Sequence, residues 1–587
     1  MFHSLKRLSS SINRYSLRSH NCGELRLKDE GKIVSLYGWV AYKRMDKFVV
    51  LKDAYGMTQL QIDDENKELK EIVKNITLES CLSVVGIVKD RKNERNKSMD
   101  TGEIEVSVQN LDILNCAPKI LPINLKNNNQ DLTKWRYRYL DIRSQYMQNN
   151  LRLRSSVTNK VRRFLTEEAA FVEIETPTLF RKTPGGAKEF VVPAGGLNKG
   201  KFYSLPQSPQ QFKQLLMVGS IDKYFQIARC YRDEGAKLDR QPEFTQIDIE
   251  LSYTNQEMIM ELIEDMIISS WPESMEELKP KKNFKQFSYD YVMEKYGSDK
   301  PDLRIPWIIN DISCLLKDIF KFNFVQCFVA RNCFSHISTS EKKKWKKIME
   351  NNENCQNFEL FKMTKSSWIR EGIKEKLVNK FDIKDDDILV VSWGNSENSV
   401  KWTLGQLRNY MGEAAGLRKG GKFEICWIVD FPLFIKEEGK YLSCHHPFTA
   451  PKEKDLEKLE NMEDLLSIKA LHYDLVINGV EVGGGSIRIH DGSLQKHVFE
   501  NILKEPSDEM KYFVEALECG APPHGGFALG LDRYITLLVG KGDSNVSIKD
   551  VIAFPKSKGG RCSMTDSPVE LDDNILKDYG ITIVKDN

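Results

Sequence analysis

Polar and apolar residues alternate in four short runs near the start of the chain. The runs span 33–44, 48–62, 81–90 and 102–114, with Gly, Asp and Asn turns between them. Alternation with a period of two predicts half-buried strands, and short strands at this spacing close into a small barrel. We therefore expect an OB-fold over residues 21–118.

The pattern becomes helical after a Pro- and Asn-rich hinge at 119–146. One face of a helix that starts near 149 carries the apolar residues Leu151, Val157, Val161 and Phe164. The following run, 171–179, predicts a strand that Pro177 stops.

Residues 285–425 differ from the segments on either side, because they are rich in lysine and poor in motif-like residues. We interpret them as an inserted α/β domain between two parts of one larger domain, 147–284 and 426–587. The expected fold class is α+β multidomain. The stretch EKKKWKKIMENNENC is interpreted as the solvated face of a helix, with an RNA-binding patch as the alternative.

Composition and net charge limit the kinds of partner that the chain can bind. Lys and Arg total 86 against 84 for Asp and Glu, so any contact with RNA must come from local patches. The 12 cysteines include no C-x-x-C pair, which argues against a zinc site or a disulfide framework and for a reducing compartment. No uncharged apolar run is as long as a membrane span, so we expect no membrane partner.

The first 20 residues form a separate segment of basic and apolar residues. MFHSLKRLSSSINRYSLRSH contains no acidic residue, and Leu5, Leu8 and Ile12 recur at helical spacing among cations and serines. These features are typical of a transit peptide and predict import into the mitochondrial matrix. A disordered basic tail is the alternative.

Two local groups of residues suggest ligand chemistry. Within the expected barrel, Arg44, Phe48 and Gln59 offer a cation, a stacking face and an amide, which suits single-stranded nucleic acid, although ordinary barrel surface is the alternative. The stretch 227–250 crowds arginines, acids and Phe244 between two apolar ends, and 526–533 adds a further arginine. Arginine forks bind phosphate and aromatic rings stack on bases, so these residues fit ATP. A surface strand pair joined by salt bridges is the competing interpretation.

These motifs resemble those of the class II aminoacyl-tRNA synthetases, in particular the aspartyl-tRNA synthetases of bacterial and mitochondrial type. FVEIETPTL, CYRDE with RQPEFTQIDIE, and GLDR resemble the three class II motifs, while LPQSPQQFKQLLM and HHPFT resemble the aspartate enzymes. The resemblance covers about residue 22 to the C-terminus. It implies an antiparallel sheet flanked by helices, an anticodon-binding OB-fold and a homodimer with Pro177 at its interface. It also implies that L-aspartate, activated with ATP and Mg²⁺, is joined to tRNA(Asp).

The resemblance implies a role for each matching residue. Arg232 and Arg533 are the implied catalytic residues, Asp474 and Glu481 the implied magnesium ligands, and Arg44, Phe48 and Gln59 the implied anticodon contacts. The implied ATP contacts are Arg232, Asp233, Glu234, Arg240, Gln241, Phe244, Gln246, Glu481, Gly530, Leu531, Asp532 and Arg533. The implied aspartate contacts are Ser208, Gln210, Lys213, Arg232, Asp248, His445, His446 and Arg488.

Four expectations add detail to this assignment. Gly526 and Gly530 should let a backbone approach a flat ligand. Without substrate, Asp248 or water should hold Arg488, because an unpaired buried arginine is costly. Asp474 and Glu481 offer the oxygen ligands that magnesium prefers, with exposed charges as the alternative. Bacterial relatives carry a glutamate where this chain has Gly185, so the substrate ammonium must rely on Asp248 or on the backbone.

Other functions share parts of this pattern. A lysyl or asparaginyl synthetase has the same barrel and motifs, but a lysine pocket needs acids in place of Lys213 and Arg488. An ammonia-dependent asparagine synthetase lacks a barrel like the one expected at 23–118. A non-catalytic RNA-binding paralogue needs a broken motif, and Arg232 and Arg533 are intact.

Overall fold

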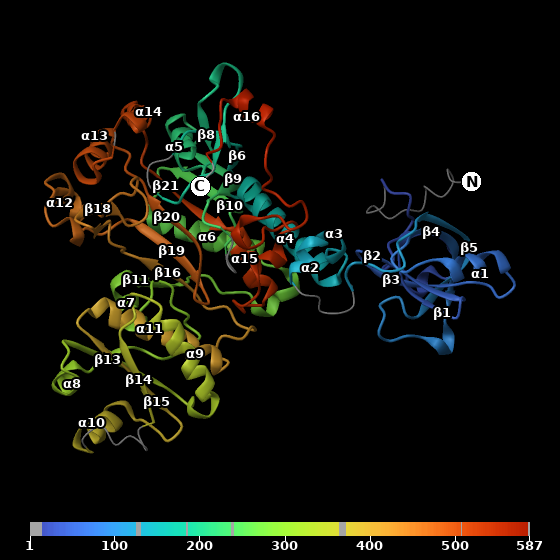
Figure 1. Cartoon of the computed structure of the whole chain (residues 1–587), viewed down its shortest axis with the longest axis horizontal. Helices are drawn as coiled ribbons and strands as arrows, with labels where there is room; N and C mark the ends of the chain where they lie inside the picture. Colours follow the sequence, from blue (N-terminus) through green and yellow to red (C-terminus); the bar gives the residue numbers. More distant parts are fainter. Residues whose placement is uncertain are drawn as a thin grey trace. The chain divides into compact units, whose positions relative to one another are not determined.

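The structure is a computed structural model that describes residues 15–124, 131–182, 186–235, 240–362, 371–505 and 507–584. The chain divides into two compact units, Met1–Asn149 and Asn150–Asn587 (Figure 1). In the described part of the chain, no helix is long and apolar enough to cross a membrane.

The N-terminal unit contains a closed five-stranded barrel, which confirms the predicted OB-fold. Its strands follow the order β1-β2-β3-β5-β4. Alternate residues such as Val49, Leu51 and Leu60 are fully buried inside the barrel, so their neighbours face outward. The bounds are β1 (Ile33–Arg44), β2 (Phe48–Asp53), β3 (Gly56–Gln61), β4 (Cys81–Asp90) and β5 (Ile104–Asn115), with α1 (Lys67–Asn75) after β3.

The last residues of the predicted transit peptide pack against this barrel. Ser19 is 5% exposed, and it donates its backbone N–H to the Ser35 carbonyl while its hydroxyl accepts from the Ser35 N–H. Arg18 Nη1 lies 3.3 Å from Asp53 Oδ2. Arg18 and Ser19 therefore belong to the folded unit, although the predicted segment ended at residue 20. Residues 1–14 of that segment lie outside the described residues.

The hinge leads into helices. Its described second half forms α2 (Asp131–Arg136) and α3 (Arg138–Asp141). The helix expected from near 149 is α4 (Gln145–Arg163), and Val157 and Val161 are buried as its periodicity predicts.

An eight-stranded sheet forms the centre of the second unit. Its order is β11-β16-β19-β20-β21-β10-β9-β6, and all neighbours are antiparallel except the two outermost pairs. The antiparallel sheet is as predicted. The bounds are β6 (Val172–Glu173), β9 (Lys223–Tyr231), β10 (Glu243–Ser252), β11 (Lys285–Ser288), β16 (Ile425–Val429), β19 (His472–Ile477), β20 (Val480–Ile487) and β21 (His524–Gly530). The strand expected at 171–179 is shorter in the structure: β6 pairs in parallel with β9 at the sheet edge, and Ile174 adds one backbone bond, from its N–H to the Phe225 carbonyl at 3.1 Å.

The two faces of this sheet have opposite chemistry. Ile247 and Ile249 of β10 are fully buried in a core with residues of α4, α6 (Gln256–Ser270) and α15 (Leu531–Val539). Because successive strand residues point to opposite faces, Asp248 and Glu250 lie on the other face. The helices thus cover one face, and the site lies on the other.

The region expected as an insertion has its own sheet. Four strands pair antiparallel in the order β12-β13-β15-β14, rather than through parallel βαβ units. Their bounds are β12 (Asn310–Asp311), β13 (Phe324–Ala330), β14 (Asn357–Phe361) and β15 (Ile388–Gly394), and the helices are α8 (Ser313–Phe320), α9 (Thr339–Glu350), α10 (Glu371–Phe381) and α11 (Glu397–Ala414). The lysine run lies on α9, where Trp345 and Met349 are buried and most of the lysines are exposed, as expected of a solvated helix face.

Shorter elements complete the second unit. They are β7 (Val191–Pro193), β8 (Phe202–Ser204), α5 (Gln210–Val218), α7 (Tyr289–Tyr296), β17 (Phe434–Glu437), β18 (Lys440–Ser443), α12 (Leu456–Glu460), α13 (Gly492–His497), α14 (Ser507–Glu518) and α16 (Asp573–Tyr579).

Candidate active site

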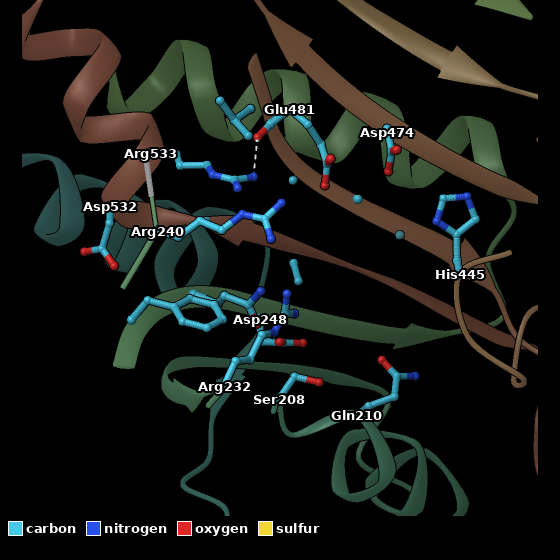
Figure 2. Close-up of a pocket in the computed structure, with 18 of the residues that line it drawn as sticks. Ser208, Gln210, Arg232, Arg240, Asp248, His445, Asp474, Glu481, Asp532 and Arg533 are labelled. Atoms are coloured by element: carbon cyan, nitrogen blue, oxygen red, sulfur yellow. Dashed lines mark hydrogen bonds between the residues drawn. The ribbon is translucent and has the colours of Figure 1, made fainter. Parts of the chain in front are cut away.

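A cavity of about 490 Å³ opens on the polar face of the eight-stranded sheet. Figure 2 shows Arg240, Asp532 and Arg533 toward one end of it and Gln210 and His445 toward the other. The structure brings together almost all of the residues assigned to ATP, aspartate and magnesium. The predicted residues that line the cavity are Ser208, Gln210, Lys213, Arg232, Glu234, Arg240, Gln241, Phe244, Gln246, Asp248, His445, His446, Asp474, Glu481, Arg488, Gly530, Asp532 and Arg533.

Two predicted ATP contacts are not part of this lining. Leu531 is 1% exposed and packs in the core beneath the sheet. Asp233 pairs with Lys188, whose Nζ lies 2.8 Å from Asp233 Oδ2.

One end of the cavity is a buried network of four charged side chains. Lys213 Nζ lies 2.5 Å from Asp248 Oδ1 and 3.0 Å from Glu250 Oε2. Arg488 donates from Nε to Glu250 Oε1 at 2.9 Å and from Nη2 to Glu250 Oε2 at 3.1 Å. Glu250, rather than Asp248, occupies the fork of the guanidinium, so the expectation that Asp248 holds Arg488 is wrong. Arg488 Nη1 also contacts His446 Nε2 at 2.6 Å and donates to Ser486 Oγ at 2.7 Å.

Glycines on the neighbouring strands make room for the acids. Gly526 pairs with Glu250 across β10 and β21, and a Cβ there would lie 2.0 Å from Glu250 Oε2. Gly484 pairs with Asp474, and a Cβ there would lie 2.2 Å from Asp474 Oδ1. The expectation that Gly526 lets a backbone approach a flat ligand is therefore wrong. The Glu250 carboxylate fills the space that a side chain at Gly526 would need.

Burial and pairing separate the two acids of β10. Burial raises the pKa of Asp248, although Lys213 opposes this. Burial also acts to raise the pKa of Glu250, but Arg488 and Lys213 overcome it and hold this pKa at about 2. Glu250 is thus the fixed counter-ion of the two cations.

Besides His472 Nδ1 on the strand above the cavity, three buried polar atoms toward this end have no hydrogen-bond partner among the described residues. They are Asp248 Oδ2, Gln210 Nε2 and Arg232 Nε. An unsatisfied buried polar atom costs free energy, so these atoms are expected to meet a ligand. One acceptor and two donors match an ammonium and a carboxylate.

The other end of the cavity carries exposed, loosely paired charges. Antiparallel β9 and β10 bring Arg232 and Phe244 together, with the guanidinium 5.1 Å from the ring centroid. Arg240 Nη1 lies 3.5 Å from Glu234 Oε2, and these side chains are 48% and 40% exposed. Arg533 donates from Nη1 to the Glu481 carbonyl at 3.1 Å (Figure 2). The charged hairpin thus faces a cavity.

Other predicted nucleotide contacts bond to the protein itself. Gln241 accepts the Lys556 N–H at 2.7 Å and donates to the Lys556 carbonyl at 3.3 Å. Asp532 accepts the Thr245 N–H at 2.9 Å and pairs with Arg154. These bonds fix the wall of the cavity.

The predicted magnesium ligands lie on adjacent strands above the cavity. Asp474 Oδ1 lies 2.9 Å from His472 Nε2, and Glu481 Oε2 lies 2.6 Å from Lys300 Nζ. Among the described residues, His445, His472 and Asp474 each offer a ligand atom within 4.8 Å of the others. Burial, together with the nearby Glu481, raises the pKa of Asp474 to about 8. A cation beside these carboxylates would relieve their mutual repulsion.

Sequence reasoning missed, among others, Glu250, His472 and Lys300, whose side chains contact predicted residues of this site. Glu250 and His472 follow from alternation, because each lies two positions from a predicted residue on the same strand, Asp248 and Asp474. No such signal marks Lys300, which comes from a loop.

The loop that lacks the family's glutamate lies largely outside the described residues, which resume at Gly186. Ala187 donates its N–H to Gln207 Oε1 at 2.8 Å and accepts from Gln207 Nε2 at 2.9 Å. The loop therefore returns to the body of the protein beside Ser208 and Gln210.

The predicted anticodon residues share one outer region of the barrel. Arg44 pairs with Phe48 across β1 and β2, and Gln59 pairs with Val50 across β2 and β3. Phe48 is partly exposed, whereas Val49 is fully buried, so the ring is not part of the barrel interior.

Comparison with known proteins identifies the fold and the family. The family model of class II tRNA synthetases for D, K and N matches residues 130–558, and that of the OB-fold nucleic acid binding domain matches 34–114. A solved asparaginyl-tRNA synthetase from Pyrococcus horikoshii, complexed with asparaginyl-adenylate, has the same fold, with a TM-score of 0.58 and 17% identity over 92% of this chain and 98% of that one.

Relatives of higher identity align with nearly the whole length of the chain. The mitochondrial aspartate–tRNA ligase of Homo sapiens is 41% identical, covering 100% of this chain and 94% of the relative. The aspartate–tRNA(Asp/Asn) ligase of Natranaerobius thermophilus is 39% identical, covering 97% of this chain and 100% of the relative. The chain therefore belongs to the class II aminoacyl-tRNA synthetases and, within them, to the aspartate–tRNA ligases.

Proposed function

We propose that this ligase activates L-aspartate with ATP at the described cavity and transfers it to the terminal 3′-OH of tRNA(Asp). The observation that carries the proposal is the cavity itself. A dry network of two cations and two acids at one end lies beside an arginine-lined end that suits a nucleotide.

The buried end would bind the amino acid. Asp248 Oδ2 accepts from the substrate ammonium, in place of the glutamate that is absent at position 185. Gln210 and Arg232 donate to the α-carboxylate. Lys213 and Arg488 present positive charge to the side-chain carboxylate, which an asparagine amide cannot match.

The exposed end would bind ATP. Phe244 stacks on the base, Glu234 accepts from its amino group, and Arg232 and Arg533 bind phosphate oxygens. The aspartate α-carboxylate is already ionised, so it attacks the α-phosphorus without a general base, and pyrophosphate leaves as aspartyl-adenylate forms. The tRNA 3′-OH then attacks the adenylate carbonyl, and AMP leaves.

Asp474 and Glu481 fit a magnesium ion. Both carboxylates line the cavity, and burial together with the nearby Glu481 raises the pKa of Asp474. When bound, the ion would neutralise phosphate charge. In the proposed resting enzyme, Lys300 neutralises Glu481.

The tRNA and a second copy of the chain are the proposed macromolecular partners. Phe48, with Arg44 and Gln59 nearby, is proposed to stack on an anticodon base. Homodimerisation is proposed through the segment at Pro177, where Val172 and Leu179 are 48% and 51% exposed. Exposed apolar residues beside an edge strand suit a second copy of the same surface.

The mitochondrial matrix is the proposed location. The acid-free N-terminal segment and the names of several relatives, such as the mitochondrial ligase of Dictyostelium discoideum, support it. Because Arg18 and Ser19 pack on the barrel, we place the removable part of the segment before Arg18.

Pyrophosphate exchange tests the central proposal. The purified chain should exchange labelled pyrophosphate into ATP with aspartate, and not with asparagine or lysine. It should then charge tRNA(Asp), with tRNA(Asn) assayed beside it. Exchange that is equal with asparagine would contradict the assignment of Lys213 and Arg488.

A further inference from the structure

Lys300 reaches the nucleotide end of the cavity from the loop that leads out of the catalytic sheet into the inserted region. Its Nζ lies 2.6 Å from Glu481 Oε2, whereas the adjacent Asp299 is 3.9 Å away. The side chain is 38% exposed and lines the main cavity. Its ammonium is thus held by one carboxylate and reached by water.

The backbone that carries Lys300 is fixed by a buried cluster. Asp302, two residues later, is fully buried and accepts from Arg304 Nη2 at 2.7 Å and from Arg418 Nε at 3.1 Å. Arg408 donates to the Asp302 carbonyl at 2.8 Å. The base of Lys300 is therefore rigid, although its tip is accessible.

The same cluster is attached to the turn between β19 and β20. A Cβ on Gly479 would lie 2.9 Å from Asp302 Cβ, and Arg304 Nη2 donates to the Asn478 carbonyl at 3.4 Å. That turn joins the strands that bear Asp474 and Glu481. The position of Lys300 relative to both carboxylates is thus set by direct packing.

Lys300 shares its surroundings with two arginines. Beside the main cavity, a space of about 180 Å³ is lined by Arg240, Lys300, Glu481 and Arg533, among others. Three cations face one carboxylate there, so the local charge favours an anionic ligand with several oxygens. The pyrophosphate part of a nucleoside triphosphate has that chemistry.

We propose that Lys300 is a phosphate-binding residue for the pyrophosphate half of ATP and, in the free enzyme, occupies Glu481 until a divalent cation takes that carboxylate. The proposal rests on the proposed function, because it needs ATP to bind at this end. The cation and Lys300 compete for Glu481, and the displaced ammonium turns to the phosphates. The inserted region thereby contributes a side chain to the reaction.

Lys300→Met tests both parts, and Lys295→Met is the matched control. Lys295 lies on α7, pairs with Glu294 and lies outside the main cavity lining. For Lys300→Met we expect the KM for ATP and for pyrophosphate to rise roughly tenfold or more, since a charge-assisted hydrogen bond is lost. The KM for aspartate should stay within about twofold, because the buried network is untouched. Lys300→Arg should recover most of the loss.

Binding of Mn²⁺ to the nucleotide-free enzyme, followed by electron paramagnetic resonance, supplies a readout independent of activity. Without its competitor, Glu481 should bind Mn²⁺ several-fold more tightly in Lys300→Met than in the parent, and Lys295→Met should match the parent.

Each result is decisive. Unchanged KM values for ATP and pyrophosphate would overturn the phosphate-binding role, and unchanged Mn²⁺ affinity would overturn the competition. A lower melting temperature in Lys300→Met, with equal losses for aspartate and ATP, would show a purely structural role and also overturn the proposal. Failure of the parent to exchange pyrophosphate with aspartate would instead contradict the proposed function.

Discussion

The two ends of the cavity hold similar numbers of charges in opposite environments. At the proposed aspartate end, the side chains of Lys213, Asp248, Glu250 and Arg488 are at most 2% exposed. At the proposed nucleotide end, Glu234 and Arg240 are 40% and 48% exposed and lie 3.5 Å apart. The charges at the first end are paired with each other and shielded from water, whereas those at the second end are exposed to it.

This difference matches two recognition tasks. Aspartate and asparagine have nearly the same shape, so only fixed charges in a dry site separate them. ATP is recognised by many weaker contacts, and its pyrophosphate must leave after each turnover. Exposed cations bind phosphates at little cost of reorganisation and release them readily.

Removal of Arg488 should give the largest effect and breaks the dry end. Arg488→Leu should lower aspartate-dependent pyrophosphate exchange more than a thousandfold while ATP binding, measured by calorimetry, survives. It should also lower the free energy of unfolding by about 3 to 5 kcal/mol, because Glu250 loses one of its two partners in a buried site. Arg488→Lys should be severely impaired, since lysine cannot form the fork.

A double variant separates the two consequences. Glu250→Leu combined with Arg488→Leu should regain much of the lost stability in denaturant unfolding, because no buried acid lacks its partner. It should regain no exchange activity. Exchange near the parental rate in Arg488→Leu would refute the contrast between the two ends.

Phe48→Ala tests whether the contrast is confined to the cavity. Stacking on a base contributes about 1 to 3 kcal/mol, so charging of tRNA(Asp) should weaken by roughly ten- to a hundredfold. Pyrophosphate exchange without tRNA should not change. If both assays fall equally, the ring serves the barrel and not the tRNA.

Burial of His472 should make the stability of the protein sensitive to acid. Burial lowers the pKa of His472 to about 3. Below pH 6.5, the ordinary pKa of histidine, His472 is protonated in the unfolded chain but stays neutral in the folded one. The folded state therefore loses stability as the pH falls toward 3. From pH 7 to pH 5 this one residue should cost about 2 kcal/mol.

The variant His472→Gln should not show this part of the stability loss, because glutamine does not titrate. Glutamine keeps an N–H that can donate to Asp474, and the pH 7 to pH 5 loss in urea unfolding should shrink accordingly. The same loss in parent and variant would show that His472 is protonated in the folded enzyme.

Arg240→Ala should give the smallest effect and sharpens the contrast from the exposed side. We expect the KM for ATP to rise by about tenfold, with the KM for aspartate unchanged. The free energy of unfolding should change by less than about 1 kcal/mol, because an exposed pair contributes little. A larger loss of stability would mean that this end, too, is a built network.

Local patterns predicted much of the fold. The runs 33–44 and 81–90 coincide with β1 and β4, because turn residues bound alternating strands there. The resemblance to the aspartyl-tRNA synthetases, rather than the local pattern, predicted most of the cavity lining. Alternation could place Glu250 on the same face as Asp248, but it could not predict the pairing of Glu250 with Arg488, because the two residues are 238 positions apart in sequence. Packing of Ser19 on the barrel and the loop-borne Lys300 likewise depend on tertiary contacts.

Gly526 and Gly484 lie opposite Glu250 and Asp474, so the positions of these two carboxylates depend on the small volume of the glycines. Adding one methyl group at Gly526 or Gly484 changes no charge, yet the new carbon would overlap a carboxylate oxygen. At Gly526 the carbon would also lie 2.2 Å from the Ile249 carbonyl oxygen, so the strand as well as Glu250 would have to shift. At Gly484 the Asp474 carboxylate would have to turn away from His472. A substitution that is mild on any chemical scale would therefore disturb the carboxylate that each glycine faces, and at Gly526 the strand beside it as well.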